Sequence, residues 1–83
     1  MDQIARTQKQ LGAVLRRQRK QLGLTQATLG GSLGMRQATV SDLESGERDT
    51  SLSTVFEAIA ALNLELVLRP RTRRSARDIE AVF

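Results

Sequence analysis

The chain has 83 residues, with 13 Lys and Arg against 9 Asp and Glu, a net charge of +4 and an isoelectric point near 11.1. It contains no cysteine and no histidine, which excludes disulfides and thiolate metal sites and removes the commonest general base and zinc ligand. The length suits one small domain, no apolar run approaches the ~20 residues that span a bilayer, and the positive charge favours a polyanionic partner. We therefore expect no catalytic residues, no metal, no cofactor and no membrane segment.

The first predicted helix runs from about Thr7 to Leu22. Thr7 and Gln10 form a capping-box pattern, in which a hydroxyl caps the first turn and a glutamine follows three residues later. Gly23 then ends the helix, because glycine readily adopts the left-handed conformation found after helix C-termini.

A second, shorter helix is predicted from Thr25 to about Leu33. Thr25 is the expected N-cap and Gly34 the expected end. Gly30 and Gly31 lie inside this helix and should each cost it roughly 1 kcal/mol relative to alanine.

Two further helices follow. One is predicted from about Gln37 to Ser45, with Gly46 as its stop, and the next begins with Ser51 as its cap. Apolar residues recur in this fourth helix at helical spacing, which predicts a stripe that faces the core. The stripe consists of Leu52, Val55, Phe56, Ile59 and Leu62.

After the fourth helix the hydrophobic period changes from helical to alternating. Residues 63–69 predict a β-strand that ends at Pro70, with three leucines on one face: Leu64, Leu66 and Leu68. The alternative is that this segment extends the fourth helix or forms a loop. Residues 70–83 predict a flexible basic tail, so the expected division is a domain over residues 1–69 and a tail over 70–83.

Residues 25–45 have the pattern of a helix-turn-helix, in which two short helices are joined by a turn that contains glycine. The second helix of such a pair lies in the major groove, where Gln can bond to adenine, Arg to guanine, and Thr can touch the thymine methyl. Side chains of this kind gather near the start of the third helix, at Arg36, Gln37, Thr39 and Ser41. The alternative is that they form only a solvated helix face.

The chain resembles the Cro/repressor class of helix-turn-helix domains, also called the Xre family. The matching elements are L-G-L-T-Q at residues 22–26, Gly34, V-S-D-L-E-S-G at 40–46 and S-L-S-T-V at 51–55. Within that class it is most similar to HipB-type antitoxins, through R-Q-A-T-V-S-D-L-E and the trailing L-x-L-x-L segment. The resemblance covers roughly residues 9–69 and implies a mostly α, lambda-repressor-like fold of four to five helices.

The resemblance also implies roles for individual residues. Bases or flanking phosphates are met by Arg36, Gln37, Ala38, Thr39 and Ser41. The DNA backbone is contacted by Thr25, Gln26 and Arg48, and Gln26 also braces Gln37. Arg19 and Glu44 form a structural salt bridge between the first and third helices. Asp42 departs from the expected pattern, because an acidic group that faces the groove repels phosphate unless it accepts from a cytosine amino group.

A single predicted strand implies a second chain. Its backbone N–H and C=O groups need partners, and no other segment of this sequence is predicted as a strand. Pairing with the same segment of a second copy would give a homodimer whose leucines, Leu64, Leu66 and Leu68, close over a shared core. Such a dimer needs a palindromic operator in double-stranded DNA.

HipB-type antitoxins bind a HipA-type kinase toxin, and the resemblance extends that expectation to this chain. The tail ends in an acidic and apolar sequence, residues 78–83, so Phe83 is a candidate anchor for a partner protein; the alternative is a disordered end.

Taken with the resemblance, the sequence therefore predicts a cytoplasmic, nucleoid-associated repressor that is the antitoxin of a toxin–antitoxin module and regulates its own operon. A stand-alone Xre-type repressor and a protein-binding adaptor on the same fold are the alternatives.

Overall fold

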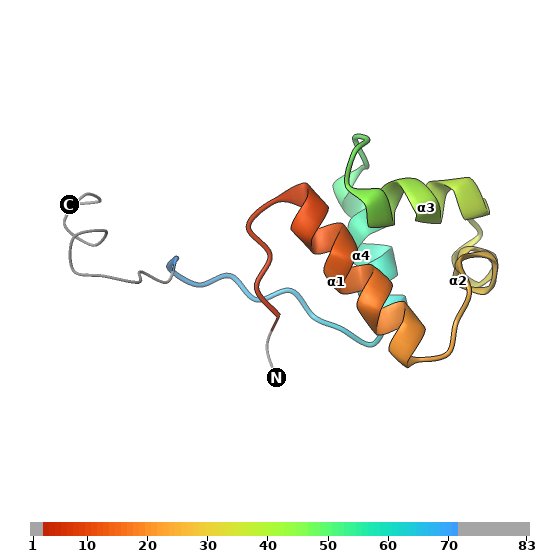
Figure 1. Cartoon of the computed structure of the whole chain (residues 1–83), viewed down its shortest axis with the longest axis horizontal. Coiled ribbons are helices and arrows are strands. Elements are labelled where there is room, and N and C mark those ends of the chain that lie inside the picture. The colour runs from red at the N-terminus through yellow and green to blue at the C-terminus, as the bar shows by residue number, and fades with distance from the viewer. Residues whose placement is uncertain (1–2, 72–83) are drawn as a thin grey trace.

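The computed structural model describes residues 3–71 and folds them into a small cluster of four helices (Figure 1). The helices are α1 (Gln8–Gln21), α2 (Gln26–Leu33), α3 (Gln37–Ser45) and α4 (Leu52–Ala61). The four predicted helices are confirmed, with ends close to the predicted ones. The described residues contain no fifth helix. None of the helices in this part of the chain is long and apolar enough to cross a membrane.

Local hydrogen bonds explain where three of the helices begin. In each case the predicted cap residue accepts a hydrogen bond from the backbone N–H three residues later, which satisfies one of the donors that a first turn leaves free. The pairs are Thr7 with Gln10, Thr25 with Thr28, and Ser51 with Thr54.

The core lies where the four helices meet, and every helix contributes to it. α3 packs against both α1 and α2, while α2 also packs against α4. The buried apolar side chains come from all four helices and from the residue after α4: Leu15, Leu29, Val40, Leu43, Ala58, Ile59 and Leu62. α3 is thus held from two sides, which fixes the helix that carries the predicted base-reading residues.

The predicted core stripe of α4 is partly wrong. Ile59 and Leu62 are buried, but Leu52 and Phe56 are 68% and 47% exposed. On a helix of 3.6 residues per turn, Phe56 lies about 100° from Val55, outside the buried arc. Leu52 shares the face of Ile59 but is the first residue of α4, at the end of the helix. α4 therefore buries a narrower face than its apolar spacing suggested.

The two glycines of α2 have different surroundings. Gly30 is buried, and a Cβ placed on it would lie 2.8 Å from the carbonyl oxygen of Met35. A Cβ on Gly31 would meet nothing within 4 Å. Gly30 is thus required by the close approach of the turn that follows α2, whereas Gly31 only lowers helix propensity.

We expect Gly31→Ala to raise the free energy of unfolding by up to about 1 kcal/mol, because alanine is the better helix former and the site has room. Gly30→Ala should lower it, since the new methyl group would push the turn away from α2. Urea denaturation of both variants measures the difference. Equal stabilisation by the two alanines would show that the turn does not approach Gly30 closely.

The chain turns sharply after α4 and leaves the helical cluster. Asn63 has a left-handed backbone, with φ of 58°, and residues 64–71 form neither helix nor strand (Figure 1). No strand occurs within residues 3–71, and the single chain offers this segment no β partner. The alternative in which residues 63–69 extend α4 is wrong. The predicted strand is not confirmed, because a strand that pairs with the same segment of a second copy has no partner in a single chain.

Candidate nucleic-acid interface

The predicted base-reading residues lie together at the start of α3 and are open to solvent. Arg36 is the N-cap residue, but its side chain makes no capping hydrogen bond. The side chain is therefore free to reach outward, and no side chain covers the first backbone N–H groups of α3. Thr39 is half-buried and the other four candidates are exposed: Arg36, Gln37, Ala38 and Ser41.

A buried ion pair holds α3 against α1. Arg19 Nε donates to Glu44 Oε2 at 2.6 Å and Nη2 donates to Oε1 at 3.0 Å, with both residues only 7% exposed. Paired donors of this kind fix the relative orientation of two planar groups. The salt bridge implied by the resemblance is thus present in the structure.

The same two side chains also bind the start of the helix-turn-helix. Arg19 Nη1 donates to the carbonyl oxygen of Leu24 at 2.7 Å, in the turn before α2. Gln26 Nε2 donates to Glu44 Oε1 at 3.2 Å. α1, the α1–α2 turn, α2 and α3 are therefore joined by one hydrogen-bonded cluster.

The hydrogen bond to Glu44 raises the pKa of the Arg19 guanidinium above its ordinary value. The stabilisation that Arg19 contributes is therefore complete at neutral pH. On the basic side it would be lost as the pH rises through the elevated pKa of the folded state.

The predicted brace between Gln26 and Gln37 is not what the structure shows. The Gln26 side chain donates to Glu44 instead, because the carboxylate lies within reach and is the stronger acceptor. Gln37 is left exposed, with its amide available to a partner.

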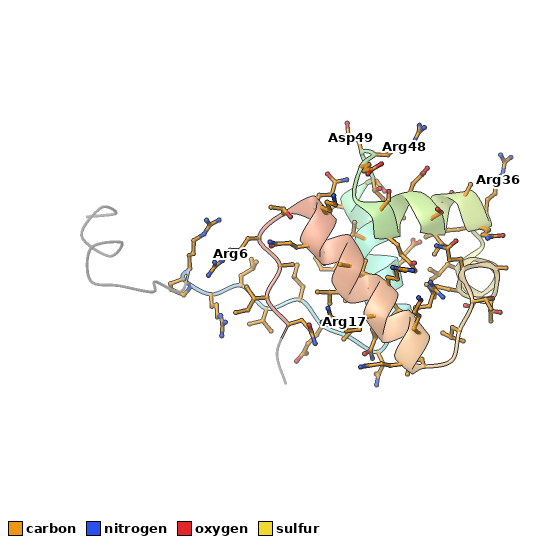
Figure 2. The ribbon with its side chains drawn as sticks, in the orientation of Figure 1. Arg6, Arg17, Arg36, Arg48 and Asp49 are labelled. Carbon is orange, nitrogen blue, oxygen red and sulfur yellow. The ribbon has the colours of Figure 1, made fainter. Side chains whose placement is uncertain are left out.

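The residues expected to contact the DNA backbone lie in two places: Thr25 and Gln26 at the start of α2, and Arg48 after α3. Thr25 caps α2 and its hydroxyl also bonds to that of Thr28 at 2.8 Å. Arg48 lies in the loop between α3 and α4, with its side chain 76% exposed. Figure 2 shows Arg36 at the start of α3 and Arg48 in the loop that follows α3, both on the upper side of the molecule, with Arg17 on the lower side.

Two features of this interface were not predicted from the sequence. Gly12 allows α1 and α3 to approach closely, since a Cβ there would lie 2.7 Å from the carbonyl oxygen of Leu43 and would also clash with that of Glu44. Gln8 at the start of α1 donates to the carbonyl oxygen of Arg48, which ties down the α3–α4 loop. A glycine inside a helical pattern was the available signal for the first feature; no sequence signal pointed to the second.

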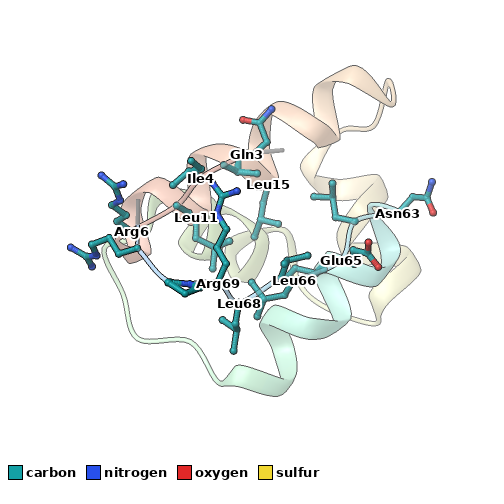
Figure 3. Close-up of a pocket in the computed structure, with 17 residues that line it drawn as sticks. Gln3, Ile4, Arg6, Leu11, Leu15, Asn63, Glu65, Leu66, Leu68 and Arg69 are labelled. Atoms are coloured by element: carbon teal, nitrogen blue, oxygen red, sulfur yellow. The ribbon is translucent and has the colours of Figure 1, made fainter. Parts of the chain in front are cut away.

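A groove of about 560 Å³ lies between the N-terminal segment, α1 and the segment after α4 (Figure 3). Ile4, Leu11 and Leu15 are among its apolar walls. The three predicted dimerisation residues also line this groove. Leu64 is half-buried against the core, whereas Leu66 and Leu68 are 46% and 88% exposed. The predicted partner anchor, Phe83, and most of the tail over 70–83 lie outside the described residues.

Comparison with known proteins gives one family match and several structural matches. The model of the helix-turn-helix family HTH_3 matches residues 15–68. A structure described as a HipB-O4 20mer complex is 31% identical, with a TM-score of 0.78, and the match covers 86% of this chain and 100% of that one. No curated protein matches the sequence.

Two further structures extend the comparison. A HipA-HipB-O2-O3 complex contains a chain that is 31% identical, with a TM-score of 0.77, over 86% of this chain and 100% of that one. The restriction-modification controller protein C.AhdI from Aeromonas hydrophila is 33% identical, with a TM-score of 0.63, over 69% of this chain and 83% of that one.

Proposed function

Because the chain belongs to the helix-turn-helix family HTH_3 and is of the HipB type, we propose that it is a sequence-specific transcriptional repressor that binds operator DNA as a homodimer. The observation that carries this proposal is the exposed start of α3. Its polar side chains are of the types that read base edges, and the helix itself is held rigidly by the buried pair of Arg19 and Glu44.

The chemistry at the start of α3 suits the major groove. Arg36 can bond bidentately to guanine and Gln37 to adenine, while Thr39 and Ser41 offer hydroxyls, and the methyl of Ala38 suits apolar contact with thymine. The backbone N–H groups and positive end of the helix favour a phosphate nearby. A protein-binding adaptor has no need of this exposed polar set, so DNA recognition is the better supported role. A DNA-binding repressor of this kind would act in the cytoplasm, at the nucleoid.

Contacts to phosphate would position α3 without reading sequence. Thr25 and Gln26 stand at the start of α2, whose N-terminal N–H groups are suited to an anion. Arg48 supplies a cation from the α3–α4 loop, and that loop is tied to α1 through Gln8. These elements flank α3 in the chain and bracket the base-reading residues.

The segment over residues 63–69 is the proposed dimerisation strand. Leu66 and Leu68 are exposed in a single chain, where they line the groove, and a second copy would cover them. Pairing of the two segments would also satisfy their backbone donors and acceptors. A symmetric dimer of this kind would present two α3 helices to a palindromic site with half-sites about one helical turn apart.

The proposed protein partner is a HipA-type kinase toxin, which makes this chain an antitoxin that represses its own operon. Support comes from the likeness to the HipB chain of a HipA-HipB complex over most of both sequences. Phe83 stays a predicted anchor for that partner. A second candidate, a stand-alone repressor, is favoured by the likeness to a restriction-modification controller protein.

We expect Gln37→Ala to weaken binding to the operator by about 1–3 kcal/mol and to relax preference at one base pair. Arg48→Ala should instead weaken binding to all DNA about equally and flatten the dependence of affinity on salt, because it removes a phosphate contact. Fluorescence anisotropy on operator and random duplexes, at several salt concentrations, separates the two effects. If Gln37→Ala weakens both duplexes equally, Gln37 does not read a base.

A further inference from the structure

An acidic side chain on α3 lies against the loop cation proposed to bind phosphate. Asp42 Oδ1 is 3.6 Å from Arg48 Nε, and the two side chains are 47% and 76% exposed. Their main chains are fixed independently of this contact. The carbonyl oxygen of Asp42 accepts from the backbone N–H of Gly46, and that of Arg48 accepts from Gln8.

The pair contributes little to folding, because exposed ion pairs are screened by water and salt. Its consequence is for binding. The Nε edge of the Arg48 guanidinium faces the carboxylate of Asp42, so a phosphate that binds this edge must displace that carboxylate. The net gain from that contact is therefore smaller than for an unpaired arginine.

We propose that Asp42, by pairing with Arg48, limits the affinity of the protein for DNA of any sequence. The inference rests on the proposed DNA-binding function. It concerns the part of the DNA affinity that does not depend on sequence. Non-specific binding is almost wholly electrostatic, so a counter-charge on one phosphate-binding arginine lowers it without touching the base-reading residues of α3.

Asp49 offers a matched control for the test. It follows Arg48 directly in the same loop (Figure 2) and takes part in no ion pair among residues 3–71. Asp42→Asn and Asp49→Asn each remove one negative charge, but only Asp42→Asn removes the ion-pair partner of Arg48. Both carboxylates are exposed or half-exposed, so both variants should fold, which circular dichroism checks.

The experiment measures the dissociation constant of the full chain for a random-sequence duplex over a range of salt concentrations. Asp42→Asn should tighten binding about two- to fivefold more than Asp49→Asn and should steepen the salt dependence. When each substitution is combined with Arg48→Ala, the difference between them should disappear.

Three results would overturn the inference. Equal effects of Asp42→Asn and Asp49→Asn would mean that only net charge matters. A difference that persists beside Arg48→Ala would mean that Asp42 repels phosphate directly. Weaker binding by Asp42→Asn would mean that Asp42 contacts DNA or presents Arg48 to it. A wild-type chain that binds no duplex would instead contradict the proposed function itself.

Discussion

Replacing Arg19 by methionine should lower the free energy of unfolding by about 3–5 kcal/mol. The change leaves the Glu44 carboxylate buried without its counter-charge and removes the donor to the carbonyl oxygen of Leu24. The total stability of a small domain is only about 5–15 kcal/mol, so this substitution should remove a large share of it. Urea denaturation followed by circular dichroism measures the loss.

Arg17→Met is the matched control for that experiment. Arg17 is also on α1 and also donates to a side chain, that of Gln3 at 2.9 Å, but this contact is exposed. Water can replace it, so we expect a change within about 0.5 kcal/mol. Similar stability losses in the two variants would show that the buried pair is not what holds α3 in place.

Replacing Leu68 by aspartate should convert the protein from a dimer to a monomer and weaken operator binding by about 10²- to 10⁴-fold. The side chain is 88% exposed in one chain, so the fold of the monomer should be unaffected. In the proposed dimer, however, it faces the shared leucine core, where an unpaired carboxylate is costly. Two monomers would then have to bind the two half-sites separately, without the high effective concentration that a dimer provides.

Val67→Asp separates this explanation from a general effect of charge on the segment. Val67 is also exposed, at 68%, but in a strand it would point to the face opposite Leu68. Light scattering should give twice the single-chain mass of 9.2 kDa for the wild type and for Val67→Asp, and the single-chain mass for Leu68→Asp. A single-chain mass for the wild type at micromolar concentration would contradict the dimer.

The helices were predictable because their ends are set by local chemistry. Thr7, Thr25 and Ser51 cap the helices that follow, and glycines end others, as at Gly46, whose φ is 67°. These signals act over a few residues of sequence, so they can be read without knowledge of the fold.

Features that depend on what packs against a helix were harder to predict. The apolar spacing of α4 does not reveal that Leu52 and Phe56 are exposed. The partner of Gln26 could not be identified from sequence either, because only the fold brings Glu44 within reach. A β-strand is harder still, since its partner strand is proposed to belong to another chain.

The candidate interface was placed by pattern, and its side chains are where the pattern put them. Arg36, Gln37 and Ser41 are exposed at the start of α3. Which bases they meet depends on the angle at which α3 enters the groove, and in the proposed dimer the spacing of the two α3 helices would constrain that angle. Recognition would then be a property of the proposed dimer on DNA more than of the single chain.

Selection of binding sites from a random duplex library by the full chain tests the role of α3 most directly. We expect enrichment of inverted repeats whose half-site centres lie about one helical turn apart. The same selection with Gln37→Ala should yield repeats that have lost preference at one position in each half-site. Failure of the wild-type chain to enrich any sequence, under salt conditions in which it binds duplex DNA, would contradict base reading by α3.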